Sequence, residues 1–179
     1  MAYGWEGEKI RLVPLDVGRH LPNAVTWLND PEVTAWTLIG DLPISCLAEE
    51  EYFRRAASET ERNLAFAVES LEGEHVGFAG IHDIDHRHGS ARTGTIIGRR
   101  DLWGRGLGRD AARVRTRYAF EVLGLRLLLS EVMAGNDASV RMLEAVGYRQ
   151  VGCIPRRYLK RGGYRDALLF ALEHDASGG

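Results

Sequence analysis

The sequence predicts one α+β domain, built on a mixed sheet of about seven strands with about four helices. Apolar residues alternate in some short segments and recur every three or four positions in others, and glycines or prolines separate the two kinds. A length of 179 residues, with 45% hydrophobic and 27% charged side chains, suits one globular domain. No repeat or linker divides the chain, so we expect a single domain over residues 1–179 whose last few residues form a disordered tail.

The elements are expected in a fixed order along the chain. Strands are predicted at residues 9–14, 64–68, 76–84, 93–97, 125–133, 149–159 and 164–172. Helices are predicted from about residue 16 to 28, at 47–58, from just after Trp103 to just before Gly124, and at 138–146.

Local patterns predict the N-terminal elements. In the first strand, Ile10 and Leu12 alternate with Arg11 and Val13, so the two pairs point to opposite faces. The helix at residues 47–58 begins with glutamates and carries arginines later, which is the order that a helix dipole favours. Two prolines and a glycine predict a loop or a short helical turn at residues 29–45. Alternation on both sides of a Glu-Gly turn at residue 73 predicts an antiparallel hairpin.

The C-terminal half is predicted in the same way. The long helix has apolar residues at spacings of three and four from Leu107 to Val122, with arginines on its other faces. Residues 125–133 are almost continuously apolar, which predicts a central strand covered on both faces. Gly147 ends the short helix that follows, and a Gly-Gly turn at residue 162 joins the last two strands.

Composition narrows the class of protein. The 23 basic and 25 acidic side chains give a net charge of −2, without the excess of one sign that attracts nucleic acid or membrane surfaces. Cys46 and Cys153 match no metal or disulfide spacing, so we interpret them as small buried side chains in a reducing compartment. The N-terminus lacks a leader pattern and no apolar segment could cross a bilayer, which predicts a cytoplasmic protein.

Residues 103–109, WGRGLGR, follow a strand and open a helix, where several backbone N–H groups lack an intrahelical partner. This segment is expected to bind an anion, with Arg105 and Arg109 adding charge-assisted contacts. A Walker-type loop would require Lys-Ser or Lys-Thr where Arg109 and Asp110 stand. A dinucleotide loop would require an acid past the end of the next strand, whereas Glu131 lies within it. A structural turn without a ligand is the third alternative.

Three blocks in order resemble the GNAT superfamily of N-acyltransferases, and specifically its Rim-type branch of ribosomal-protein and polyamine N-acetyltransferases. They are TIIGRRDLWGRGLGRDA at 95–111, NDASVRMLEAVGY at 136–148 and YLKRGGYRDALLF at 158–170. The resemblance implies a mostly antiparallel sheet whose fourth and fifth strands splay to admit the acyl-CoA arm. It also implies acetyl-CoA as co-substrate, no metal, and a chain that can form homodimers.

The resemblance implies a set of cofactor-binding residues. They comprise three strand positions beside the pantetheine, the loop around the pyrophosphate, and the first turn of the next helix: Ile96, Ile97, Gly98, Arg105, Gly106, Leu107, Gly108, Arg109, Asn136 and Ser139. Trp103 stands where the superfamily often has Gln or Arg, and Trp occurs there in the Rim-type branch.

Acyl transfer requires an oxyanion site and a donor for the departing thiolate. We expect a backbone N–H near Ile97 to hold the oxyanion. Many family members place a Tyr where this chain has Leu143, whereas the Rim-type branch has a Ser three residues after the Asn. Ser139 is therefore the expected donor, and an ordinary first-turn helix residue is the alternative for it.

The general base is the least defined part of the expected site. The branch often has a Glu two residues before the strand glycine, and that position is Arg92 here. His82 and Asp83 lie on a strand expected to flank the acceptor cleft and are the candidate bases. Asp85, His86 and His88 are further candidates.

Other functions remain open from the residues. The run HDIDHRH at 82–88 could hold a metal, although strand and turn geometry would scatter its side chains. The basic run RRYLKR at 156–161 suits a solvated or acceptor-facing surface better than nucleic acid. We predict an acetyltransferase for a primary amine of a protein N-terminus, a polyamine or a small amine. A non-catalytic acyl-CoA-binding regulatory module is the alternative, and a structural protein without affinity for coenzyme A is another.

Overall fold

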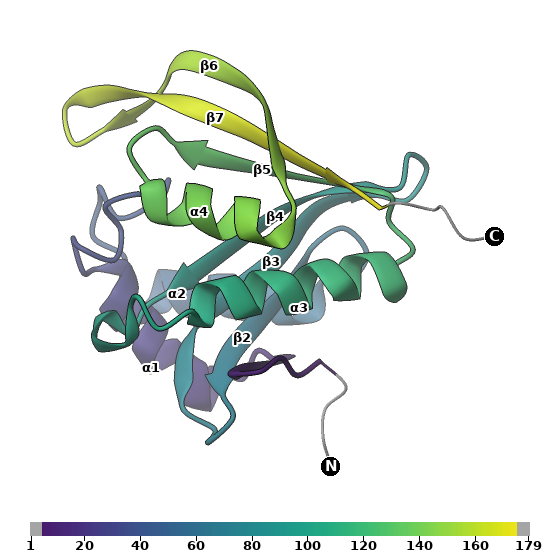
Figure 1. The fold of residues 1–179 in the computed structure, drawn as a ribbon. Helices are drawn as coiled ribbons and strands as arrows, with labels where there is room; N and C mark the ends of the chain where they lie inside the picture. The colour runs from purple at the N-terminus through teal and green to yellow at the C-terminus, as the bar shows by residue number, and fades with distance from the viewer. Residues whose placement is uncertain (1–4, 175–179) are drawn as a thin grey trace.

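A seven-stranded mixed sheet with the strand order β1-β2-β3-β4-β5-β7-β6 forms the centre of the computed structural model, which describes residues 5–174 (Figure 1). The expected C-terminal tail lies outside the described residues. The strands are β1 (Ile10–Pro14), β2 (Leu64–Ser70), β3 (His75–Asp85), β4 (Ser90–Ile97), β5 (Leu127–Met133), β6 (Arg149–Lys160) and β7 (Gly163–Glu173). The helices are α1 (Val17–Leu28), α2 (Cys46–Ser58), α3 (Leu107–Glu121) and α4 (Asp137–Val146), with a short 3-10 helix, η1 (Arg100–Leu102). The predicted fold class is confirmed.

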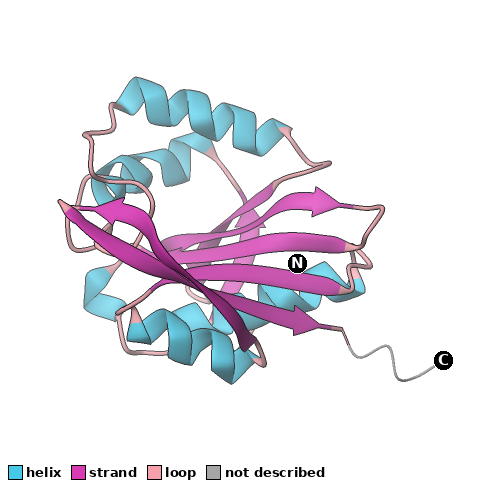
Figure 2. Ribbon diagram, turned by 90° about the horizontal axis from the view of Figure 1, so that it is seen from above, coloured by secondary structure: helices cyan, strands magenta, loops and turns pink. Residues whose placement is uncertain are grey.

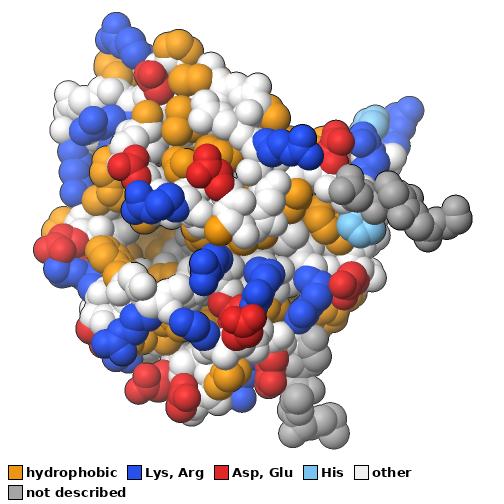
Figure 3. Space-filling view, in the orientation of Figure 1, with side chains coloured by type: hydrophobic (Ala, Val, Ile, Leu, Met, Phe, Trp, Pro, Cys, Tyr) orange, Lys and Arg blue, Asp and Glu red, His pale blue; other side chains and the backbone are white. Residues whose placement is uncertain are grey.

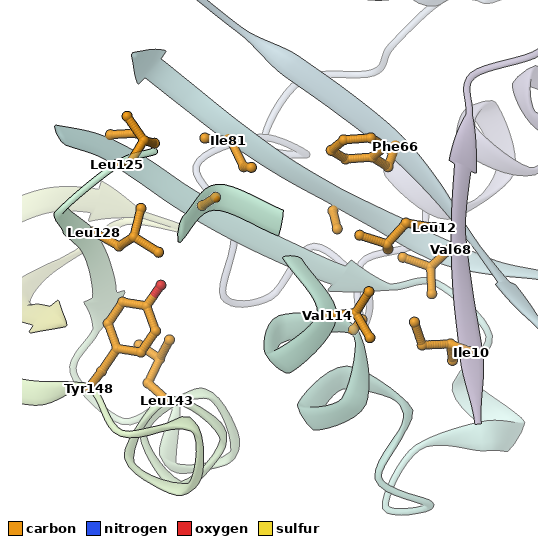
Figure 4. Packing of buried hydrophobic residues seen from close by; sticks show 14 of the residues in the cluster. Ile10, Leu12, Phe66, Val68, Ile81, Val114, Leu125, Leu128, Leu143 and Tyr148 are labelled. Atoms are coloured by element: carbon orange, nitrogen blue, oxygen red, sulfur yellow. The ribbon is translucent and has the colours of Figure 1, made fainter. Parts of the chain in front are cut away.

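Helices cover both faces of the sheet (Figure 2). On one face, Leu21 of α1 and Phe53 of α2 pack with Phe78 of β3. On the other, residues of α3 and α4 such as Val114 and Leu143 join the main core (Figure 4). The sheet therefore separates two environments, and anything that connects them must pass between strands.

The one parallel pairing of the sheet, between β4 and β5, is short. It joins Ser90, Ala91 and Arg92 to residues 127–129 and then stops, although β4 continues to Ile97 and β5 to Met133. Every other neighbouring pair in the sheet is antiparallel. The expected splay of the fourth and fifth strands is thus present from residue 93 onward.

Side chains bridge the point at which the two strands separate. The Thr93 hydroxyl donates to the Leu129 carbonyl oxygen over 3.3 Å, and the Ser130 hydroxyl donates to the Thr93 carbonyl oxygen over 3.1 Å. These bonds take the place of backbone ladder bonds just past the last paired residues. The split therefore begins at a fixed place.

The structure corrects several expectations. Leu129, the last β5 residue that pairs with β4, is 38% exposed, so the strand is not covered on both faces. Cys46 and Cys153 are free and exposed, because one begins α2 and the other lies on the edge strand β6. Val122 is also exposed, since α3 ends at the residue before it.

No helix within residues 5–174 combines the length and apolar character needed to cross a membrane.

Candidate functional site

The loop before α3 presents free backbone donors at the start of that helix. Gly104 and Gly106 have φ values of 75° and 83°, and Gly106 caps the helix without any side-chain bond. Helix geometry leaves the next three N–H groups, of residues 107–109, without intrahelical acceptors. The acid of the first turn, Asp110, is turned away, because its carboxylate accepts from the backbone N–H groups of Lys9 and Ile10. These donors and the positive end of the helix dipole favour an anion.

Basic side chains surround these donors. Arg105 and Arg109 are exposed, and the Lys9 Nζ donates to the Arg105 carbonyl oxygen over 2.7 Å. Figure 3 shows Lys and Arg side chains along the edge of a hollow that α3 borders. Lys9 was not among the predicted residues, since it lies almost one hundred positions from the loop and no local motif connects them.

The free edge of β4 faces the gap beside this loop. Gly98 donates to the Val76 carbonyl oxygen of β3, so the alternation of an antiparallel ladder turns the N–H groups of Thr95 and Ile97 away from β3 and toward β5. The Ile97 carbonyl oxygen accepts from the Trp103 indole over 2.8 Å. Strand and loop are thereby held together.

The first turn of α4 closes the other side of the gap. Asn136 is its N-cap, and its Oδ1 accepts from the Ser139 N–H over 3.2 Å. The Ser139 hydroxyl is half-buried and makes no hydrogen bond within residues 5–174. Leu143 is a core residue at 1% exposure, and the buried Tyr148 hydroxyl lies 3.1 Å from that of Thr93.

A pocket of about 360 Å³ opens on the opposite face of the sheet, at the same split. Its walls come from β3, β4, β5, β6 and the loop after α1, and comprise Trp36, Leu38, His82, Asp83, Arg92, Thr93, Ser130, Glu131, Met133, Arg157 and Tyr158. Thr93 and Ser130 also make the bonds at the point of separation. The pocket therefore reaches the gap between the strands.

The structure brings two of the candidate bases to this pocket and leaves the others outside its lining. His82 is half-buried, and burial lowers its pKa, so its imidazole is neutral near pH 7 and can accept a proton. Asp83 adopts a positive φ of 51° in a β-bulge. Asp85 bonds to His88, and His86 bonds to a backbone carbonyl, both around the turn after β3. No group of side chains that could hold a metal occurs in the described part of the chain.

Glu131 is the acid in the pocket that sequence reasoning missed. It forms an ion pair with Arg92, and the Tyr158 hydroxyl donates to it. A carboxylate is therefore present beside position 92, but β5 supplies it. The available signal was the polar pair at residues 130–131, which interrupts an otherwise apolar strand.

Comparison with known proteins agrees with this geometry. A family model described as acetyltransferase (GNAT) domain matches residues 9–149, which is more than half of the chain. The chain is 25% identical over 146 residues to the uncharacterized N-acetyltransferase p20 of Bacillus licheniformis, covering 80% of this chain and 82% of that protein. It is 29% identical over 121 residues to the spermidine N(1)-acetyltransferase of Escherichia coli K12, covering 68% of this chain and 63%, less than two thirds, of that enzyme.

Solved structures show the same fold. A spermidine N-acetyltransferase from Vibrio cholerae, in complex with CoA and spermine, superposes with a TM-score of 0.83 at 21% identity, covering 92% of this chain and 95% of that one. A GNAT-family acetyltransferase from Bacillus anthracis gives a TM-score of 0.81 at 16% identity, with coverage of 94% and 96%. The chain belongs to the acetyltransferase (GNAT) domain family and is an N-acetyltransferase.

Proposed function

We propose that the enzyme transfers an acetyl group from acetyl-CoA to a primary amine, by direct attack within a ternary complex. The single observation that carries the proposal is the split between β4 and β5, which lies between a helix N-terminus without a side-chain cap and a pocket. A thioester placed in that split is open to the pocket side. The Vibrio cholerae structure, described as a complex with CoA and spermine, supports a CoA-type donor and an amine acceptor in this fold.

Residues of this chain fit the parts of coenzyme A. The pyrophosphate suits the N–H groups of Leu107, Gly108 and Arg109 after Gly106, with Arg105 and Lys9 nearby. The pantetheine arm carries amides, which match the unpaired edge of β4 around residues 96–98 and the Asn136 end of α4. Two observations support this assignment of residues to coenzyme A: α3 has no side-chain cap, and one edge of β4 is unpaired beyond Arg92.

Each step of the transfer has a candidate group. His82 takes a proton from the acceptor ammonium, with Asp83 as the alternative base, and the neutral amine forms a C–N bond to the thioester carbon. The Ile97 N–H faces the gap and suits the oxyanion. When the C–S bond breaks, the Ser139 hydroxyl donates a hydrogen bond to the thiolate, and the thiolate takes up the second proton, which the attacking nitrogen loses. Amide and free thiol are the products.

The donor half is tested by calorimetry and by thiol release. We expect saturable heat with coenzyme A, and thiol release when an amine is added. The Ser139→Ala variant should lower kcat by about tenfold, which is one lost charge-assisted hydrogen bond, with little change in the Kd for coenzyme A. Absence of heat would refute the proposed function, whereas heat without turnover on any amine would favour the regulatory module.

The base is tested by pH profiles. His82→Gln should lower kcat/KM by about a hundredfold or more and remove the acidic limb of its pH profile. His88→Gln, in the turn outside the pocket, is the matched control and should keep the parental kcat/KM and the acidic limb of its pH profile. If Asp83→Asn instead removes that limb, Asp83 takes the role of the base.

We further propose that residues 1–179 act as one domain, of the Rim-type branch, in the cytoplasm and as a homodimer. Sedimentation equilibrium checks the last point directly, since a homodimer has twice the chain mass of 19.9 kDa. A single species at the chain mass over micromolar concentrations would contradict it.

A further inference from the structure

The acceptor pocket contains charges of both signs, and they are not equivalent. Its lining includes the carboxylates of Asp83 and Glu131 and the guanidinium groups of Arg92 and Arg157. Arg92 and Glu131 form an ion pair, and Tyr158 adds a hydrogen bond to the same carboxylate. These two charges therefore largely neutralise each other before any acceptor binds.

The other two charges are unpaired. Within residues 5–174, neither Asp83 nor Arg157 has an ion pair, and both are exposed at the pocket. The Arg157 guanidinium lies over the ring of the neighbouring Tyr158, with its Cζ 5.6 Å from the ring centroid. The pocket thus offers one available anion and one available cation.

Irregular backbone places both groups. Asp83 has a φ of 51° in the β3 bulge, and its N–H donates to the Asn63 Oδ1. Arg156, next to Arg157, has a φ of 50° in the β6 bulge, and its N–H donates to the Asp166 Oδ1. Bulges re-aim side chains, and left-handed backbone at non-glycine residues is uncommon and concentrates at functional sites. Two such bulges, each held by a side-chain acceptor, border one pocket.

Apolar side chains complete the lining. Trp36 and Leu38 come from the loop after α1 and are 41% and 67% exposed, and Met133 lies at the end of β5. These surfaces gain by covering an apolar group. A polyamine would use Asp83 but would bring additional positive charge toward Arg157 and leave that guanidinium without an anion.

We infer that the acceptor is an amino acid type of molecule, with a primary amine, a nearby carboxylate and an apolar side chain. Arg157 binds the carboxylate, Asp83 attracts the ammonium group, and Trp36 and Leu38 cover the side chain. The amine is then held at the split between the strands, where the thioester is proposed to lie. This inference rests on the proposed acetyl transfer and specifies its acceptor.

The experiment compares matched acceptors with acetyl-CoA: phenylalanine against phenethylamine, leucine against isopentylamine, and spermidine. We expect kcat/KM for each amino acid to exceed that for its decarboxylated partner by about tenfold or more, since a charge-assisted contact is lost. Arg157→Gln should abolish that ratio, mainly through KM. Arg149→Gln, exposed on the same strand and outside the pocket lining, should preserve it.

The outcomes separate this inference from the proposed function. No thiol release with any acceptor would refute acetyl transfer itself. Release with spermidine or the decarboxylated amines at rates equal to or above those with the amino acids would overturn only the acceptor class, as would an unchanged ratio in Arg157→Gln. An Arg157→Gln protein that melts like the parent excludes misfolding as the cause.

Discussion

The buried imidazole of His75 should make the folded protein lose stability as the pH falls from 7 to 5. His75 is 9% exposed on β3 and packs between the rings of Trp27 and Phe78, with the His20 ring 4.6 Å away. Its Nε2 donates to the Gly77 carbonyl oxygen, which leaves Nδ1 to accept from the Asn23 amide. Protonation of Nδ1 would break that bond and place a charge among rings.

The sign and size follow from the pKa. Burial, and then the neighbouring His20, lower the pKa of His75 from 6.5 to about 4. The unfolded chain therefore takes up a proton below pH 6.5 that the folded protein does not bind until about pH 4. The free energy of unfolding thus has its full value only above pH 6.5 and falls as the pH drops toward 4. Linkage over these two pKa values gives a loss of about 2 kcal/mol between pH 7 and pH 5.

Urea unfolding at pH 7 and pH 5 measures this loss. Other groups also titrate, so the comparison is with His75→Phe, which should be less stable at pH 7 but lose about 2 kcal/mol less on acidification. His86→Gln removes an exposed imidazole and should keep the parental pH dependence. The same pH dependence in His75→Phe and the parent would refute the reasoning, as would an NMR midpoint near 6.5 for His75.

Two further changes test the packing around the split. Arg115→Met should stabilise the protein by about 1–4 kcal/mol. The Arg115 guanidinium is fully buried, its Nη1 donates to the Thr95 hydroxyl, and its Nε and Nη2 have no hydrogen-bond partner within the described residues. A lower urea midpoint would contradict this prediction. Gly98→Ala should destabilise by about 1–3 kcal/mol, because its added Cβ would lie 1.9 Å from Trp27 Cδ2. Gly94→Ala lies within β4, whereas Gly98 follows its last residue, and nothing is within 4 Å of the new Cβ at position 94. This variant should be within about 0.5 kcal/mol of the parent; equal losses in both variants would contradict the contact.

Local patterns were sufficient for the elements. Strand alternation at Ile10 and Leu12 and the glycine at 147 act within a few residues, so they predict where a strand lies or a helix ends. The loop and helix of residues 103–121 were also predicted. The backbone N–H groups at the start of a helix belong to one continuous segment, so the local sequence is enough to locate them. The residues expected to bind the cofactor remain predictions.

Apart from His82 and Asp83, the pocket lining could not be predicted, because its residues come from five separate parts of the chain. Arg92 alone indicated a missing carboxylate, whereas the structure sets Glu131 against it across the split. The helical pattern did not single out Arg115, which is buried on α3 and donates to Thr95 of β4. Exposure of Cys46 and Cys153 likewise depends on where their elements lie in the fold.

A split sheet leaves backbone groups that must find partners outside the sheet. On β4 these include the N–H groups of Thr95 and Ile97, while the Ile97 carbonyl oxygen is already satisfied by Trp103. An apolar side chain in the gap would leave them unpaired, and a ligand with amides along an extended chain would pair with them. If acetyl-CoA lies in the split as proposed, strand register, more than side-chain identity, selects the donor. In the same proposal, side chains from the bulged strands β3 and β6 set the acceptor.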